Sequence, residues 1–329
     1  MVNWTVFEGA AAAWDEVLAA VEPGNFYQCH AWGEYRGGMG WQPLRLIGRR
    51  GDGAVVTLAQ MLLRRRLGAT VVWIPGGPAG DTACWAQTLP QMLRARFGAA
   101  CYCRVNLLRE GTAATADTLR GCGWRPPSAR LGTGLSLELD LQGAAAERLT
   151  LASRNWRRNL RRSTKYGLSI ELWREPDPAQ MVSIYRDMES YKGLAAQSSE
   201  QALGAMVERL GPRLLLFRCL DDEGHLLALR AAGLAGPRAW DLLAAASRAA
   251  RKLYASHALF WALTEACRDR GATAYDLGGA DPTGNKGVFD FKCGSGAHLI
   301  EYAGEWEWAG IPLLAQAVGM MMKSRGLVA

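Results

Sequence analysis

Apolar and polar positions along the chain follow two periods, one typical of strands and one typical of helices. In the first half, short apolar runs are separated by turn residues and by stretches with apolar positions three or four residues apart. Asp52-Gly53 stands between two strand-like runs, which predicts a hairpin. The pattern predicts strands at 4–8, 43–49, 54–64, 69–74, 100–107 and 135–141, and helices at 11–21, 27–36, 84–97 and 113–121.

The second half repeats this order of elements without visible sequence similarity to the first. It predicts helices at 145–166, 178–191, 200–210 and 255–270, and strands at 168–173, 213–220, 225–234, 239–246, 272–277 and 299–306. Mixed order of this kind indicates an α+β fold rather than a doubly wound parallel sheet. We place the domain boundary near Gln142-Gly143, which gives domains at 1–143 and 144–309 and a C-terminal helix at 310–329.

Composition narrows the class of protein. A chain of 329 residues with 49% apolar and 21% charged residues is long enough for two domains and excludes general disorder. The eight cysteines form no CxxC pair and no histidine cluster accompanies them, so we expect reduced thiols, no metal site and a cytoplasmic protein. The N-terminus lacks signal-peptide features, and no apolar run reaches about 18 residues. Residues 311–322 either pack on a domain or rest on a membrane surface.

The net charge of +7 is concentrated in one segment. Residues 149–170 contain six basic side chains and no acidic one, so the rest of the chain carries 7 − 6 = +1. In a helix, five of them share one face, while Trp156 and Leu160 form an apolar pair on another face that can anchor it. Such a row either binds an anionic partner, such as phosphate, RNA or lipid head groups, or is a solvated helix face. The five basic side chains are Arg154, Arg158, Arg161, Arg162 and Lys165.

Three other segments can carry chemistry. A predicted strand ends in Gly278-Gly279, where backbone can approach a ligand closely or simply turn. Phe291-Lys292 combines an aromatic ring with a lysine that could stabilise a developing oxyanion, or is a surface lysine beside core aromatics. Asp81 follows a Pro- and Gly-rich loop and is either a catalytic acid–base group or the N-cap of the next helix.

Together these segments resemble the FemABX family of non-ribosomal peptidyltransferases. The resemblance extends from about residue 26 to residue 308 and is carried by five segments in order. They are Phe26 to Arg36 followed by Gly40-Trp41, Ile74-Pro75-Gly76-Gly77-Pro78 to Asp81, Arg154 to Gly167, Tyr275-Asp276-Leu277-Gly278-Gly279, and Gly287 to Gly294.

The resemblance implies two tandem acetyltransferase-like (GNAT) domains, each a mixed, mostly antiparallel sheet flanked by helices. It implies transfer of an amino acid from aminoacyl-tRNA to an amine of a peptidoglycan precursor, either UDP-linked or lipid II, or of a related acceptor. It implies no metal, no coenzyme A and no DNA, with contact at the inner membrane surface as one option. By position, Lys292 matches a lysine that stabilises charge in the transition state and Phe291 shapes its pocket. Arg36 matches a contact to the acceptor's diphosphate, and Tyr191-Lys192 a second basic contact.

The sequence departs from the family pattern at three places. Gly76 stands where the family loop often has a basic residue, and Ser295 follows Gly294 in place of an aromatic-Gly pair. No long coiled-coil insertion interrupts the second half. Two other functions stay open: an acyl-CoA-dependent N-acyltransferase and a non-catalytic RNA-binding protein. The first would need a glycine-rich pyrophosphate loop, and residues 248–254 before the long helix contain no glycine.

Overall fold

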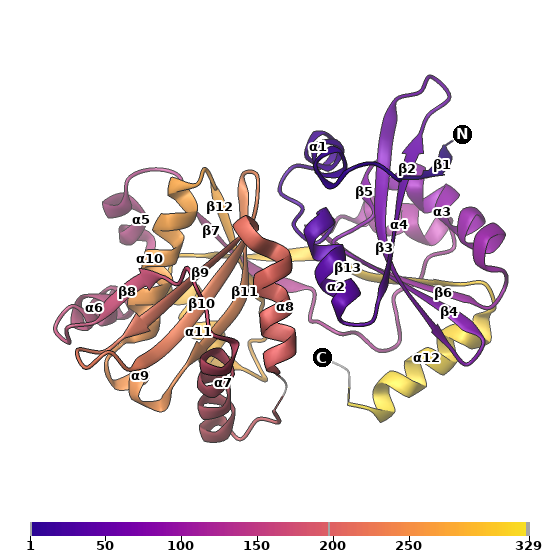
Figure 1. Ribbon diagram of the computed structural model, residues 1–329. Helices are drawn as coiled ribbons and strands as arrows, with labels where there is room; N and C mark the ends of the chain where they lie inside the picture. The colour runs from indigo at the N-terminus through magenta and orange to yellow at the C-terminus, as the bar shows by residue number, and fades with distance from the viewer. Residues whose placement is uncertain (1, 197, 327–329) are drawn as a thin grey trace. The chain divides into compact units, whose positions relative to one another are not determined.

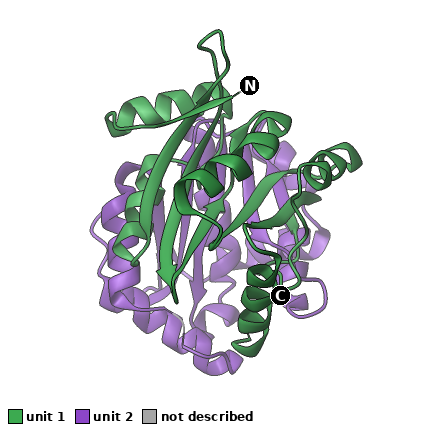
Figure 2. Cartoon of the chain, turned by 90° about the vertical axis from the view of Figure 1, so that its right-hand side faces the viewer, with its two compact units in different colours: residues 1–136, 300–329 green, residues 137–299 purple. Residues whose placement is uncertain are grey.

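A computed structural model describes residues 2–196 and 198–326 of the chain. The chain forms two compact units, one made of residues 1–136 and 300–329 and the other of residues 137–299 (Figure 2). In the described part of the chain, no helix is both long and apolar enough to cross a membrane. The predicted C-terminal helix is present as α12 (Pro312–Ser324), while residues 327–329 of that prediction lie outside the described residues.

The first unit is built on a mixed sheet (Figure 1). β1, β2, β3 and β4 are antiparallel neighbours, β6 lies parallel to β4, and β13 lies antiparallel to β6. The short β5 pairs with β3. The strands are β1 (Asn3–Val6), β2 (Gln42–Arg49), β3 (Val55–Arg66), β4 (Ala69–Pro75), β5 (Ala79–Gly80), β6 (Cys101–Glu110) and β13 (His298–Ala309).

Helices cover this sheet and bury its apolar side chains. The largest fully buried side chains include Trp85 of α3 and Trp124, whose rings meet edge to face with centres 5.5 Å apart. Such aromatic pairs add packing energy beyond the area that they bury. The other helices of this unit besides α12 are α1 (Ala11–Val21), α2 (His30–Gly38), α3 (Thr82–Phe97) and α4 (Ala113–Gly121).

The second unit has a sheet of the same kind. β8, β9, β10 and β11 are antiparallel neighbours, β12 lies parallel to β11, and β7 follows β12 in the strand order. The strands are β7 (Leu135–Asp140), β8 (Ser169–Leu172), β9 (Leu214–Leu220), β10 (Leu226–Ala235), β11 (Arg238–Ala246) and β12 (Ala274–Gly279). The helices are α5 (Ala145–Leu151), α6 (Arg154–Ser163), α7 (Pro178–Lys192), α8 (Glu200–Leu210), α9 (Arg248–Lys252), α10 (Ala255–Asp269) and α11 (Lys286–Gly294), with a 3₁₀ turn at Gly211–Arg213.

The chain repeats one order of elements twice and exchanges the last strand of each repeat. Each repeat is a strand, two helices, three antiparallel strands, a helix, a parallel strand and a helix, ended by β7 in the first and by β13 in the second. β7 stands beside β12 of the second repeat, and β13 pairs with β6 of the first. Residues 300–309 therefore lie in the first compact unit, whereas the sequence analysis put them in the second domain.

The short elements β5 and α9 were not predicted, and two longer segments also differ from the predictions. The single helix expected at 145–166 is two helices, because Ser153 leaves the helical conformation and caps α6 with a hydrogen bond from the Trp156 amide to its Oγ, at 3.2 Å. The glycine-rich segment 278–296 contains a helix, α11, that the sequence analysis did not predict. All eight cysteines are unpaired, and five of them are buried.

Candidate functional site

Lys292 is a buried lysine held by backbone carbonyls. It lies in the last turn of α11 and is 8% exposed. Its ammonium nitrogen donates to the carbonyl oxygens of Gly278 and Gly279, at 3.0 and 2.7 Å. An ammonium has three N–H donors, so these two bonds orient the group and leave the third N–H available. All three residues are candidates from the sequence, named there in two separate segments, and the structure places these segments in contact.

The carbonyls that hold Lys292 come from the end of β12, where β12 has parted from β11. The two strands pair in parallel only from Arg238 with Ala274 to Trp240 with Asp276, and both continue beyond that point. Gly278 has φ +70°, a left-handed conformation that favours glycine, and its amide donates to Asp276 Oδ1 at 2.7 Å. This local geometry turns both carbonyls toward the lysine.

An ion pair that the sequence analysis missed lies next to Lys292. Arg230 of β10 donates two hydrogen bonds to Asp241 of β11, at 2.9 and 2.7 Å, and both side chains are buried. The hydroxyl of Tyr275 donates to the same carboxylate at 2.8 Å. The sequence signal that could have found the pair is a single charged residue within the apolar part of each strand. Because the pair neutralises itself, it can surround Lys292 with polar groups without adding net charge.

Burial lowers the pKa of Lys292 below its usual value of 10.5. Desolvation is the largest cause; the charge of Asp241 opposes it, Arg230 adds to it, and Asp276 opposes it more weakly. The fixed dipoles of two carbonyls favour the charged ammonium at this position. The arrangement holds a cation in surroundings where a new negative charge nearby would be strongly stabilised.

Aromatic rings form one wall beside the lysine. Phe291 packs against His257, Phe260 and Trp156, with ring centres 5.1, 5.7 and 6.2 Å apart. The guanidinium carbon of Arg230 lies 4.7 Å from the centre of the Phe260 ring and 5.7 Å from that of Phe291. Burial lowers the pKa of His257 to about 4, so this ring is neutral at pH 7. Phe291 therefore joins the residue next to it in the chain, Lys292, to this aromatic wall.

The basic helix α6 is joined to the helix that carries Lys292. The amide of Ser153 donates to the carbonyl of Gly294 at 2.9 Å. A Cβ atom at Gly294 would stand 3.1 Å from Cδ1 of Trp156, so the two helices approach closely at this glycine. Trp156 anchors α6 in the aromatic wall, as predicted, and fixes the direction in which its arginines point.

The predicted row of basic side chains is exposed along α6 and the turn after it. Among the described residues, none of the five forms an ion pair with a carboxylate. Arg158 donates to Asn155 at 2.7 Å, and Arg162 donates to the Tyr254 hydroxyl at 3.0 Å. Lys165 lies in the turn beyond the helix, which ends at Ser163. A cationic surface of this kind is open to an anionic partner.

Tyr191 and Lys192 end α7 near the carboxyl end of β11. The Tyr191 hydroxyl donates to the carbonyl of Ala246 at 3.3 Å, and Arg251 lies over its ring, 5.6 Å from the centre. The pKa of Lys192 is lowered, first by desolvation and second by the charge of Arg251. The two residues therefore add a second cationic position within the same unit.

Arg36 lies in the first unit as a half-buried guanidinium among aromatic rings. Its guanidinium carbon is 5.1 Å from the Trp73 ring centre and 5.8 Å from that of Tyr35. Its buried Nε has no hydrogen-bond partner among the described residues, and no carboxylate there pairs with it. Desolvation is the largest cause that lowers its pKa; Tyr35 opposes this shift, and the charge of Arg64 adds to it. The structure thus holds a cation whose charge is not neutralised locally.

Arg64 is a second basic residue at this place, and the sequence analysis did not select it. Its Nε donates to the carbonyl of Gly40 at 3.0 Å, and its guanidinium carbon lies 4.4 Å from the centre of the Trp41 ring. Trp41 in turn packs against Trp73, with ring centres 5.6 Å apart. Arg36 and Arg64 therefore form a two-arginine, two-tryptophan cluster that suits a phosphate-bearing ligand.

The loop at residues 75–78 is fixed by buried amides. Gln28 donates to the carbonyl of Pro75 at 2.8 Å, and Asn25 donates to that of Gly76 at 2.6 Å. Gly76 has φ +69°, and a Cβ there would lie 2.8 Å from Oδ1 of Asn25. These contacts explain why this chain has glycine where the resemblance would place a basic residue.

Asp81 caps α3 with its side chain, accepting from the Cys84 amide at 3.1 Å. Hydrogen bonds from Cys84, backbone first, lower the pKa of this exposed carboxyl. A lowered pKa weakens a carboxylate as a base. Of the two roles that the sequence left open, the geometry gives this residue the capping one. Nowhere in the described part of the chain do His, Cys, Asp and Glu gather in a group that could hold a metal ion.

The sequence of this chain is similar to an acetyltransferase domain and to a glycyltransferase. Residues 152–292 match the family model of the acetyltransferase (GNAT) domain. A lipid II:glycine glycyltransferase of Staphylococcus saprophyticus is 28% identical over 109 residues, which is 32% of this chain and 26% of that protein. The chain therefore spans about a quarter of the length of this curated relative.

Solved structures are similar over nearly the whole chain. A crystal structure of FemX matches with a TM-score of 0.82 and 16% identity, over 97% of this chain and all of the other. A tandem GNAT protein from the clavulanic acid biosynthesis pathway matches with a TM-score of 0.58 and 14% identity, over 95% and 99%. L-PGS from Bacillus licheniformis matches with a TM-score of 0.56 and 14% identity, over 97% of each chain. The expected α+β fold with tandem acetyltransferase-like architecture and the resemblance to the FemABX family are confirmed.

Proposed function

We propose that the protein is an aminoacyltransferase that moves an amino acid from aminoacyl-tRNA to an amine of a peptidoglycan precursor or a related acceptor. The observation that carries the proposal is the geometry of Lys292. Its ammonium is buried, fixed by two carbonyls and left with one N–H to donate. An acyl-transfer site needs such a donor to stabilise the oxyanion of the tetrahedral intermediate.

The proposed reaction needs no covalent intermediate on the protein. The acceptor amine attacks the ester carbonyl of the aminoacyl group, and a carbon–nitrogen bond forms while negative charge develops on the carbonyl oxygen. The ester carbon–oxygen bond then breaks, and the proton lost by the amine ends on the departing ribose oxygen. An aminoacyl ester is already activated, so alignment and charge stabilisation suffice. We leave Asp81 out of this mechanism because its carboxylate caps α3.

The donor side of the proposal rests on α6. Its exposed arginines have no carboxylate partners among the described residues, and a tRNA would supply the missing negative charge. The hydrogen bond from Ser153 to Gly294 joins this helix to α11 and Lys292 within one compact unit. An RNA held by α6 would thus be bound by the unit that carries the proposed oxyanion donor. We include Lys192 as a further cationic contact in this unit.

The acceptor side of the proposal rests on Arg36 and Arg64. Both are guanidinium groups on tryptophan rings, and Arg36 has no neutralising carboxylate among the described residues. A diphosphate presents paired oxygens that match guanidinium donors. Peptidoglycan precursors carry a diphosphate, and the name of the Staphylococcus relative includes lipid II. These facts support a diphosphate-linked acceptor.

An acyl-CoA donor is the competing function. The connection from β11 to α10 would then carry a glycine-rich loop that binds pyrophosphate. Here the connection contains the short helix α9 and no glycine. The residue before α10 is Tyr254, which adopts the left-handed φ of +57° but carries a bulky side chain where such a loop would have glycine. The side chain of Tyr254 is bonded to Arg162. The geometry supports the aminoacyl-tRNA donor over acyl-CoA.

A direct assay separates these functions. Purified protein is incubated with a UDP-linked muropeptide or lipid II as the acceptor and with a mixture of charged tRNAs or acetyl-CoA as the donor, and the product is read by mass spectrometry. We expect a mass increase of one amino acid with charged tRNA only, and its loss after ribonuclease treatment. Acetyl transfer from acetyl-CoA to either acceptor, with no aminoacyl transfer, would overturn the proposal.

A further inference from the structure

Exposed apolar and basic side chains lie at one end of the first unit's sheet, where neighbouring strands begin or end. β4 and β6 are parallel and β13 is antiparallel to β6. The β3–β4 turn, the start of β6 and the end of β13 therefore lie at the same end of the sheet. The Thr70 amide donates to the carbonyl of Ala100, and the Gly310 amide to that of Cys101. The β3–β4 turn and the start of α12 are therefore neighbours, as Figure 1 also shows.

Exposed apolar side chains lie in the β3–β4 turn and along α12. Leu67, at the β3–β4 turn, is fully exposed, and Leu313 and Met320 on α12 are 71% and 67% exposed. On α12, positions 313, 317 and 320 share the face opposite Met322, which packs into the unit. A helix with an apolar outer face as well as an apolar inner face is unusual in a water-facing position, and exposed patches of this kind mark interaction surfaces.

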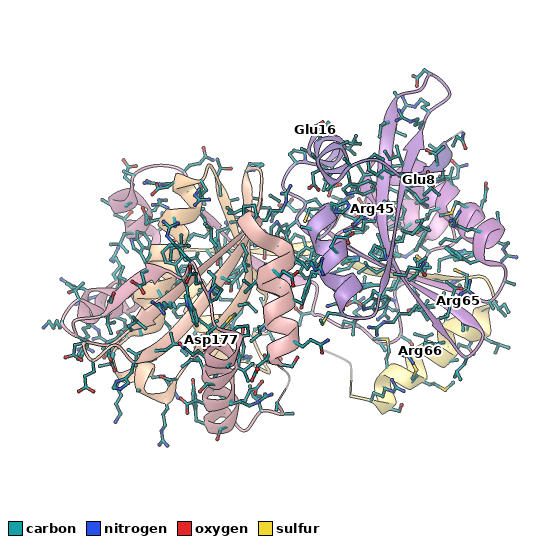
Figure 3. All side chains as sticks on the ribbon, viewed as in Figure 1. Glu8, Glu16, Arg45, Arg65, Arg66 and Asp177 are labelled. Carbon is teal, nitrogen blue, oxygen red and sulfur yellow. The ribbon has the colours of Figure 1, made fainter. Side chains whose placement is uncertain are left out.

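The charges around these side chains have one sign. Arg65 and Arg66 precede Leu67 and are exposed (Figure 3). Residues 53–80, 82–109 and 309–329 contain no acidic residue. The exposed basic side chains that these segments also contribute are Arg94, Arg96, Lys323 and Arg325. Aliphatic and methionine side chains among exposed arginines fit an anionic lipid surface, where apolar groups enter the interface and cations meet head groups.

We propose that this surface, made of Arg65, Arg66, Leu67, Leu313 and Met320, docks the protein on an anionic membrane. RNA is the less suitable partner, because the most exposed apolar side chains of this surface are leucine and methionine. The aromatic rings nearby, Phe97 and Trp308, are partly buried and lie under Arg96 and Arg94, so they are not open platforms on which bases stack. Docking does not depend on the proposed activity. Its link to the acceptor does rest on that function: Arg64 lies on β3, which ends at Arg66 immediately before Leu67, so Arg64 and Leu67 are at most about 10 Å apart at the rise of a β-strand. A diphosphate at a lipid surface would lie within reach of that strand, which favours a lipid-linked acceptor over a UDP-linked one.

Co-sedimentation with vesicles tests the proposal. The full chain is mixed with vesicles of phosphatidylcholine alone and of phosphatidylcholine with 30% phosphatidylglycerol, a mixture chosen for its negative charge. We expect binding to the anionic vesicles only, weakened by salt. Arg65→Gln with Arg66→Gln should weaken partitioning about thirtyfold, from the contribution expected per basic side chain near such a surface. Leu67→Asn should weaken it about tenfold; asparagine tolerates the left-handed φ of +49° at this position, so the turn is kept.

Matched controls lie in the second unit. Leu151→Asn replaces another exposed leucine, and Arg154→Gln with Arg158→Gln removes the same charge from α6. Both should bind vesicles like the wild type, while the α6 variant should lose tRNA affinity if the proposed function is right. Failure of wild type to bind anionic vesicles, or equal binding by the Leu67 and Arg65/Arg66 variants, would overturn the docking proposal alone. Loss of tRNA binding rather than vesicle binding in the Arg65/Arg66 variant would make this surface an RNA site and would also overturn it.

Discussion

At the scale of single residues, Lys292 carries the proposed chemistry, and its removal has a distinct expected signature. Lys292→Met keeps the length of the side chain and removes the charge. We expect kcat for aminoacyl transfer to fall about 10²–10³-fold, as is typical when one oxyanion donor is lost. Affinity for tRNA should be unchanged, because α6 is intact. The measurement is single-turnover transfer at saturating substrates with a melting curve as the control; activity within about threefold of wild type would remove Lys292 from the mechanism.

The same residue predicts a pH profile. Only the protonated ammonium stabilises an oxyanion, and burial lowers the pKa of Lys292 below 10.5. The rate should therefore fall at alkaline pH, through a pKa lower than that of an ordinary lysine. Lys292→Arg should keep part of the activity and lose this alkaline limb, because a guanidinium stays charged. An identical alkaline limb in the arginine variant would assign the titration to another group.

We expect His257 to make the free energy of unfolding depend on pH. Its folded pKa is about 4 and its unfolded value about 6.5, so the unfolded chain binds the proton first as pH falls. Stability should thus be complete above pH 6.5 and be lost toward pH 4, by about 2 kcal/mol between pH 7 and 5. His257→Phe keeps an aromatic ring in the wall and removes the titration. Urea unfolding of both proteins at pH 7 and 5 checks this, and the same pH dependence in the two would contradict it.

Sequence reasoning found residues whose local pattern is distinctive and missed those that only the fold brings together. Lys292, Gly278 and Gly279 could be selected because a double-glycine strand end and a Phe-Lys pair stand out in the chain. Arg230 and Asp241 could not be paired, since their contact depends on the register of β10 and β11. Asp81 was selected for a catalytic role that the structure does not support. A carboxylate directly before a helix looks the same in the sequence whether it caps the helix or acts as a catalytic acid or base.

At the scale of elements, the joint between α6 and α11 depends on one glycine. Gly294→Ala places a methyl group 3.1 Å from Trp156, which should destabilise the protein by about 1–3 kcal/mol and loosen both helices. Gly287→Ala is the matched control on the same helix, because nothing lies within 4 Å of the added Cβ. The control should be neutral or stabilising by up to about 1 kcal/mol.

Thermal unfolding of the two variants and their tRNA affinities provide the measurement. We expect only the Gly294 variant to lose both stability and binding. Equal melting temperatures for the Gly294 and Gly287 variants would show that the close approach of the two helices at Gly294 does not contribute to stability. The contact between the two helices was not predicted, because the sequence analysis predicts one helix over residues 145–166 and does not identify Ser153, a residue type that commonly caps helices, as the start of a new one.

At the scale of the whole molecule, the exchanged strands decide which segments stabilise which unit. Deleting residues 298–329 removes β13 and exposes the edge of β6. We expect amide protection to fall in β4 and β6 of the first unit and to persist in β9, β10 and β11, which hydrogen exchange with mass spectrometry resolves. Deleting residues 312–329 alone keeps β13 and should keep most of the protection. Equal losses in both units after the longer deletion would contradict the division.

The exchange also explains why the domain boundary was the least predictable feature of the fold. Periodicity along the chain marks β7 and β13 correctly as strands near 135–141 and 299–306. It carries no information on which neighbour each one pairs with, since pairing is set by contacts far apart in sequence. A boundary drawn between repeats therefore leaves each final strand with the repeat that precedes it.

The position of β13 in the chain also sets an order of events during synthesis. Residues 137–299 contain every part of the second unit, so that unit can fold as soon as they leave the ribosome. The first unit emerges earlier yet waits for its closing strand, roughly 8–30 s at about 5–20 residues per second. Throughout that interval the backbone of β6 presents an open edge to other chains. Slow translation or truncation near the 3′ end of the message would prolong this exposure, so the nascent first unit is the part of the protein that most needs a chaperone.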